Sequence, residues 1–93
     1  MNKNLAQEAM EIIYGDREKT HGDPARNLDA IADMWTAITG KRIPPSGVCL
    51  MMIALKVTRA ANDPSHRDHW LDIVGYALLA ERCGYVQESV EEE

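Results

Sequence analysis

The sequence predicts an all-α protein, namely a four-helix bundle of up-down topology that homo-oligomerisation completes. Apolar residues recur at the three- and four-residue spacing of amphipathic helices, and no segment alternates like a strand. Proline, glycine and capping residues divide the chain into four helical segments with short links, which favour antiparallel neighbours. A chain of 93 residues buries a modest core, so association between copies is a natural way to add buried area.

The first helix is expected from about Leu5 to Tyr14, with Asn4 as its N-cap and Gly15 as its stop. Its apolar stripe comprises Leu5, Ala9, Ile12 and Ile13.

The second helix has a strong start signal, because Asp23 suits the N-cap and Pro24 suits the first helical position. Gly40 ends it. The residues expected to face inward are Leu28, Ile31, Ala32, Trp35 and Ile38.

The third helix is expected from about Ser46 to Ala61, after a link that Pro44 and Pro45 keep from being helical throughout. The fourth follows a break at residues 62–64 and ends near Gly84. Its start fits a capping box, with Ser65 as the cap and Asp68 at the third helical position. The inward residues of the two helices are predicted to be Val48, Met51, Met52, Leu55, Trp70, Ile73, Val74, Ala77 and Ala80.

Composition limits the classes of function. The formal net charge is −5, and the few cations are interleaved with acids, so we expect no nucleic-acid partner. The chain has no long apolar run and no N-terminus of the signal type, so we expect a cytoplasmic protein with no membrane partner. Cys49 and Cys83 fall at apolar helical positions and are expected to be buried thiols. Residues 1–85 are expected to form one helical domain and residues 86–93 a flexible acidic tail.

The main candidate site is a charged cluster on either side of the break between the third and fourth helices. Lys56 and Arg59 lie one turn apart, and both side chains suit phosphate oxygens. Asp68 and Asp72 are also one turn apart, as a shared magnesium ion requires, and Tyr76 follows one turn later. The alternative is a set of salt bridges between the two helices.

Asp72 is the strongest single candidate, because Asp is a poor helix former and no local role explains it, whereas the capping box explains Asp68. Gly75, unusual within a helix, indicates either close helix packing or room for a ligand beside Tyr76.

A second group lies at the start of the second helix. Capping is the favoured role of Asp23, with metal binding as the alternative. His21 and Asn27 are candidate ligand contacts at the same place. No residue is assigned a catalytic role, because no nucleophile arrangement and no Gly-rich phosphate loop is present.

The segment 19–23, together with further residues along the chain, resembles a family of small phage and prophage proteins defined only as a domain of unknown function. The resemblance covers roughly residues 12–82 and implies the host-cell cytoplasm for a phage-encoded chain. Pro44 departs from it, standing where a capping Ser or Thr is expected. The other matching positions are Asn27, Trp35, Pro45, Leu55, Lys56, Arg59, Asp68, Trp70, Asp72, Gly75, Tyr76 and Ala77.

More distantly, the third and fourth helices resemble those of the MazG-type all-α nucleotide pyrophosphohydrolases. Those enzymes bind magnesium through a Glu-Glu-x-x-Glu motif on one helix and a Glu-x-x-Asp motif on the next. Asp72 matches the Asp of the second motif, but His69 stands at its Glu position. The acidic triplet is absent, and Lys56 and Arg59 stand in its region. The resemblance therefore implies a MazG-like fold with a degenerate metal motif.

Three hypotheses follow. The first is a magnesium-dependent nucleotide pyrophosphohydrolase, with metal at Asp68, Asp72 and Asp23 and phosphate at Lys56 and Arg59. The second is a non-catalytic protein that sequesters a nucleotide signal, such as one used in host defence. The third is a helical oligomer that acts through protein partners, with a purely structural charged cluster.

Overall fold

The computed structural model describes residues 3–15 and 24–84, and for residues 24 and 25 it describes the backbone alone. Within these residues the chain forms four α-helices and no strand, which confirms the all-α prediction. The helices are α1 (Leu5–Tyr14), α3 (Pro24–Thr39), α4 (Pro45–Asn62) and α5 (Arg67–Arg82).

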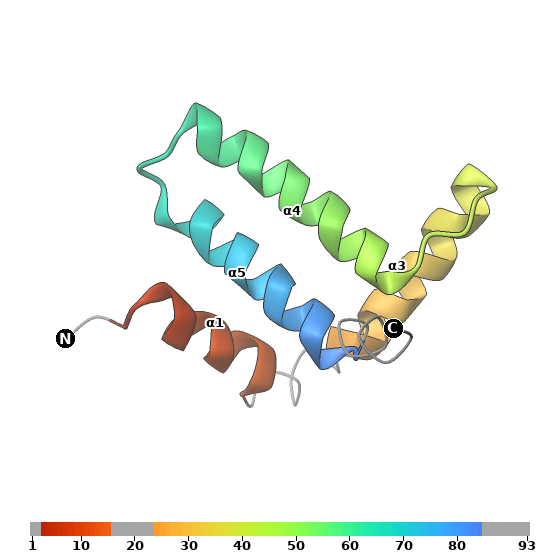
Figure 1. Cartoon of the computed structure of the whole chain (residues 1–93), viewed down its shortest axis with the longest axis horizontal. Helices are drawn as coiled ribbons and strands as arrows, with labels where there is room; N and C mark the ends of the chain where they lie inside the picture. Colours follow the sequence, from red (N-terminus) through yellow and green to blue (C-terminus); the bar gives the residue numbers. More distant parts are fainter. Residues whose placement is uncertain (1–2, 16–23, 85–93) are drawn as a thin grey trace, which may run out of the picture.

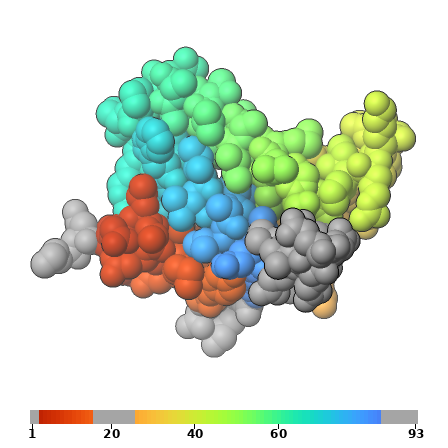
Figure 2. Space-filling view, in the orientation of Figure 1, coloured from red at the N-terminus to blue at the C-terminus, as the bar shows by residue number. Residues whose placement is uncertain are grey.

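The described helices form an up-down bundle only in part (Figure 1). Helices α4 and α5 are antiparallel, as the short link between them predicts. Helix α1 lies along α5 but runs in the same direction, because Glu8 pairs with Arg67 near the start of α5 and Ile13 with Arg82 at its end. Helix α3 crosses the end of this layer and rises away from α4. The surface is hollowed between α3 and α4 (Figure 2).

Local sequence signals account for the helix ends. Asn4 caps α1 in a reciprocal capping box, accepting from the Gln7 amide at 2.8 Å while the Gln7 side chain accepts from the Asn4 amide at 3.1 Å. Gly40 ends α3 with a φ of 74°, a conformation that glycine adopts without strain. The turn into α4 is held by Thr36, whose hydroxyl accepts from the Ile43 amide at 2.9 Å and lies 3.3 Å from the Ile43 carbonyl.

The start of α5 differs from the prediction. The N-cap is His66 rather than Ser65, and it makes no side-chain capping bond. The Ser65 hydroxyl instead donates to Asp63 Oδ1 at 3.0 Å, within the turn. Asp68 lies in the first turn of α5, 3.8 Å from His66 Nε2. The predicted capping box is therefore wrong, because α5 begins one residue later than the pattern predicts, which places Ser65 in the turn before the cap.

The core joins all four helices, but it is smaller than the apolar stripes predicted. Six side chains expected to face inward are exposed, because one chain offers too few neighbours to cover all the apolar arcs of the helices. Trp70 has a local reason as well, since its indole N–H donates to the Pro64 carbonyl at 2.9 Å. The buried cluster comprises Ile13, Leu28, Ala32, Val48, Cys49 and Leu79. The exposed residues are Ile31, Ile38, Met51, Leu55, Trp70 and Ala77.

Candidate functional site

Two adjoining pockets meet at Tyr76 and Leu79, and together they are called the Tyr76 cleft below. The first, of about 220 Å³, lies between α1 and α5 and is lined by Ala9, Ile12, Ile13, Leu71, Asp72, Gly75, Tyr76 and Leu79. The second, of about 270 Å³, lies where α3 and α4 meet α5 and is lined by Asn27, Leu28, Ile31, Trp35, Val48, Met52, Tyr76 and Leu79.

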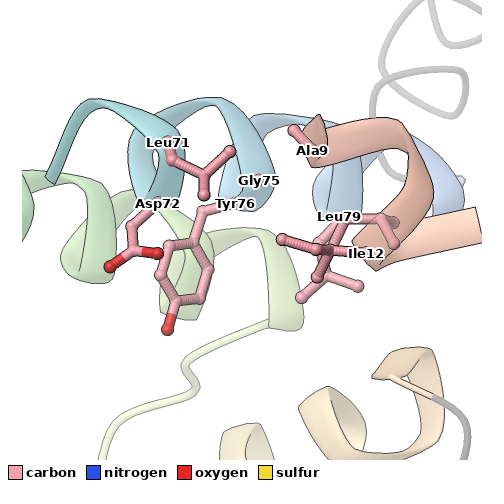
Figure 3. A pocket seen from close by; sticks show the side chains of 8 residues that line it. Ala9, Ile12, Leu71, Asp72, Gly75, Tyr76 and Leu79 are labelled. Atoms are coloured by element: carbon pink, nitrogen blue, oxygen red, sulfur yellow. The ribbon is translucent and has the colours of Figure 1, made fainter. Parts of the chain in front are cut away.

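Two polar groups of the cleft project from one side of α5. Asp72 and Tyr76, one turn apart, extend from the same face of the helix, and Ile12 and Leu79 close the other side (Figure 3). Asn27 contributes an amide from α3. The rest of the lining is apolar, as in most small-molecule sites.

Asp72 forms an ion pair with Lys56 across α4 and α5. Lys56 Nζ lies 3.1 Å from Asp72 Oδ2, and the two side chains are 15% and 41% exposed. This ion pair gives Asp72 a structural role, which no local sequence signal explained. It agrees with the salt-bridge alternative for Lys56 and Asp72. An ammonium carries three N–H donors, so this single contact does not saturate Lys56.

Arg59 and Asp68 do not join this ion pair. Arg59 follows Met52 and Lys56 on one face of α4, but its guanidinium makes no ion pair with any residue that the structure describes. Asp68 contacts His66 instead. Of the four residues in the predicted cluster, Lys56 and Asp72 thus form an ion pair, whereas Arg59 and Asp68 are exposed charges separate from it.

The space beside Gly75 decides between the two explanations for that glycine. A Cβ built on Gly75 would meet no heavy atom within 4 Å, and Gly75 lines the first pocket. Close helix packing therefore does not explain it, and the glycine leaves open space next to Tyr76.

The metal prediction has limited support in this geometry. Among residues 3–15 and 24–84, no three His, Cys, Asp or Glu side chains are grouped as a metal ion requires. Asp72 gives one oxygen to Lys56, and Asp68 faces His66. Asp23 and His21 lie outside the described residues. Magnesium binding stays a prediction.

Sequence reasoning missed the apolar walls of the cleft, among them Ile12, Leu79 and Met52. These residues looked like ordinary core positions, and spacing does not distinguish a filled core from a lined pocket. The one signal pointing to the pocket was Gly75, which marks a position without a side chain.

Cys49 and Cys83 lie on α4 and just after α5 and are not joined in a disulfide. Burial raises the pKa of the Cys49 thiol to about 11, and the nearby Cys83 adds to the shift. Both contribute to the core beneath the cleft, as predicted for Cys49, whereas Cys83 is only half-buried.

No helix in the described part of the chain is both long and apolar enough to cross a membrane.

Comparison with known proteins agrees with the predicted phage family. The chain is 34% identical to the "Gene 55 protein" of Mycobacterium phage D29 over 93 residues, which are all of this chain and 60% of that protein. It is 40% identical to the "Gene 55 protein" of Mycobacterium phage L5 over 75 residues, covering 80% of this chain and 48% of that protein. The chain thus spans about half the length of these relatives.

No solved structure matches the chain, so the similarity to the pyrophosphohydrolases stays a prediction. Residues 4–84 match the family described as "Domain of unknown function (DUF6378)". This match includes all four helices and every described residue of the Tyr76 cleft. The chain therefore belongs to the DUF6378 family of phage-type domains of unknown function.

Proposed function

We propose that the protein binds a small nucleotide-type ligand in the Tyr76 cleft, with the phosphate at Lys56. The observation that carries this proposal is that Asp72, which lines an open cleft with apolar walls, holds the mostly buried side chain of Lys56 in an ion pair. A nucleotide has the matching two parts, a flat apolar base and an anionic phosphate.

The lining of the two pockets is that of small-molecule sites, but each pocket alone is smaller than the usual volume of about 300 to 1,000 Å³, so the ligand in this proposal occupies both. Tyr76 stands between them, where its ring can stack on a base and its hydroxyl can bond to the base edge. Asn27 adds an amide that can both donate and accept hydrogen bonds.

In this proposal Asp72 is a positioning residue. Its carboxylate holds the Lys56 ammonium against α5, while the two remaining N–H donors of Lys56 serve the phosphate. Arg59, with no ion pair to a described residue, supplies a second cation on the same face of α4. Because the chain carries a net charge of −5, these cations must act locally against a repulsive overall field.

Hydrolysis is the finer proposal, and it needs magnesium. Asp72, with Asp68 and Asp23, would be the metal ligands that the pyrophosphohydrolase resemblance implies. We favour binding without turnover, because Asp72 already contacts a cation of the chain itself. A sequestering protein, such as one that captures a signalling nucleotide, requires only binding and no hydrolysis.

The test is a calorimetric and thermal-shift screen of mono-, di-, tri- and cyclic nucleotides against the full chain, with and without magnesium. We expect at least one nucleotide to bind, and Lys56→Met to weaken it about 10-fold or more, as expected on loss of a charge-assisted hydrogen bond. Lys41→Met is the matched control, because Lys41 is exposed in the turn between α3 and α4. If no nucleotide binds, or if Lys56→Met binds as tightly as the unmodified chain, the proposal fails.

Release of phosphate or pyrophosphate in the same samples separates turnover from binding. Metal-dependent release that Asp72→Asn abolishes would establish the enzyme instead of the sequestering protein.

The ion pair itself favours a second candidate, in which the cluster is purely structural and the protein acts through protein contacts. In that case Lys56→Met and Asp72→Asn change stability, and no nucleotide binds to either variant or to the unmodified chain.

Self-association is part of this proposal as well. Its support is the set of large apolar side chains that α3 and α4 leave exposed, among them Ile38 at 74% and Leu50 at 67%. Single exposed apolar residues are ordinary, but a group of them marks an interaction site.

A further inference from the structure

One side of α4 has no charged residue and no neighbour among the described helices. Leu50, Ala54, Val57 and Ala61 are all exposed and form a row along it, with Leu50 67% and Val57 51% exposed. No helix covers the side of α4 that faces away from α5 (Figure 1). These four residues are called the α4 seam below.

The charges of α4 lie elsewhere on the helix. Its only charged residues are Lys56 and Arg59. Arg59 comes nine residues after Leu50, which at about 100° per residue places it on the opposite side of the helix. Lys56 faces Asp72 on α5. An exposed helix side without a charge, in a chain with 27% charged residues, indicates a surface that another molecule covers.

The order of large and small residues identifies that molecule. The row has the four-three-four spacing of a helix–helix seam. When the seam is laid antiparallel against its own copy, Leu50 faces Ala61 of the second copy and Ala54 faces Val57. Every large side chain then meets an alanine, whereas parallel pairing sets leucine against leucine and alanine against alanine. The seam is thus complementary in shape to its own antiparallel copy.

We propose that two copies of this chain associate about a two-fold axis, with their α4 seams packed antiparallel. The two-fold arrangement uses the same patch on both copies, as closed homodimers do. It also sets the two α4 dipoles in opposite directions.

The apolar surface around the seam extends beyond α4. It continues onto α3, since Met51 and Ile38 line a common shallow pocket with Trp35. Helix α4 is about 27 Å long and about 10 Å wide, at 1.5 Å per residue, so it alone offers a footprint on the order of 270 Å². A specific interface buries roughly 800 Å² per partner, so the seam forms the centre of the contact and the adjoining side chains of α3 enlarge it.

The dimer leaves the Tyr76 cleft open, because Lys56 and Met52 lie on the sides of α4 that face α5 and α3. Each copy therefore keeps a complete site, and dimer formation and ligand binding are separable.

Sedimentation velocity of the full chain over a dilution series is the test. We expect a monomer–dimer equilibrium that Ala54→Glu shifts to monomer, with the dissociation constant raised about 100-fold or more, because a carboxylate would be buried without a partner. Ala77→Glu is the matched control, since Ala77 is an exposed alanine within α5. It should leave the dimer unchanged.

Circular dichroism verifies that each variant is folded, and Leu50→Gln replaces Ala54→Glu if the latter is not. The antiparallel register is checked by mixing Ala54→Cys with Val57→Cys chains, which should form a mixed disulfide faster than either chain forms its own. A monomer at all concentrations, a dimer that both seam variants leave intact, or faster disulfide formation between two Ala54→Cys chains would overturn the proposal.

Discussion

The ion pair between Lys56 and Asp72 allows a quantitative test of the site by a double-mutant cycle. The variants are Lys56→Met, which keeps the aliphatic stem, Asp72→Asn, which keeps the shape and one acceptor oxygen, and the double variant. The quantity measured is the coupling free energy, which is the part of the stability change that the two single variants do not explain separately.

The structure sets the expected magnitude. The two charged atoms are 3.1 Å apart, with Lys56 only 15% exposed and Asp72 41% exposed. Fully exposed pairs contribute about 0.2–1 kcal/mol, and the shielding of Lys56 places this pair at the upper end, near 1 kcal/mol. Asp72→Asn should cost more than Lys56→Met, because it leaves the less exposed charge unpaired, whereas Asp72 alone stays hydrated.

The assay is urea unfolding followed by circular dichroism, supported by thermal melts, in which about 1 kcal/mol lowers the Tm of a domain of this size by roughly 4–8 °C. Stability changes that add to within about 0.3 kcal/mol in the double variant would refute the ion pair as a contributor to stability.

The same variants then distinguish the roles of Asp72 in ligand binding. If Asp72 positions Lys56, Asp72→Asn weakens nucleotide binding with or without magnesium, because the Lys56 ammonium is no longer held in place for the phosphate. If Asp72 binds magnesium, the same change abolishes magnesium-dependent binding. Unchanged affinity of Asp72→Asn, both with and without magnesium, would contradict both roles.

Three further outcomes follow from the structure. At pH 8 a thiol reagent should modify Cys83 much faster than Cys49 in the folded chain, because a pKa of about 11 leaves Cys49 almost no thiolate. Mass spectrometry of the digested protein measures the two rates of modification, and equal rates would contradict the prediction. Gly75→Ala should raise the free energy of unfolding by about 0.5–1 kcal/mol, because the new methyl group meets nothing within 4 Å; a loss of stability in urea unfolding would show that the space is not open. Thr36→Val should lower the free energy of unfolding by about 1–2 kcal/mol, because the hydroxyl contacts with Ile43 at the α3–α4 turn are lost. Thr58→Val is the control and should cost clearly less, since it removes a single exposed hydrogen bond to the Ala54 carbonyl. Equal effects of the two variants would show that the turn does not depend on Thr36.

Sequence signals were most reliable where a helix end depends on local chemistry. The limits Leu5–Tyr14, the cap at Asn4, the start at Pro24 and the stop at Gly40 all agree with the structure. The start of α5 was wrong because the helix begins one residue later than the capping pattern predicts, and spacing does not reveal that the Ser65 hydroxyl belongs to the preceding turn.

Facing directions were harder to predict than helix ends. Met51 and Leu55 fit an apolar stripe, but they lie on the exposed side of α4. A helix that is apolar over most of its circumference gives no single inward direction, so periodicity alone does not say which side meets α5. The approach of Lys56 to Asp72 was anticipated because a short link makes α4 and α5 antiparallel neighbours. The Tyr76 cleft was not anticipated, since it depends on how α1 and α3 are placed around α5.

The attachment of α1 has a consequence for motion. Its polar contacts with α5 include the Glu8–Arg67 ion pair at one end. At the other end, Arg82 donates to the Ile13 carbonyl and lies over the Tyr14 ring, and the Tyr14 hydroxyl donates to the Leu78 carbonyl at 3.4 Å. Such ties at the surface contribute little free energy and weaken in salt. Salt therefore weakens the polar part of the α1 attachment, while Ala9 and Ile13 stay buried between the two ends. Rising ionic strength should speed amide hydrogen exchange in α1 before it affects α4 or α5, and the cleft would then admit its ligand by the outward swing of one short helix.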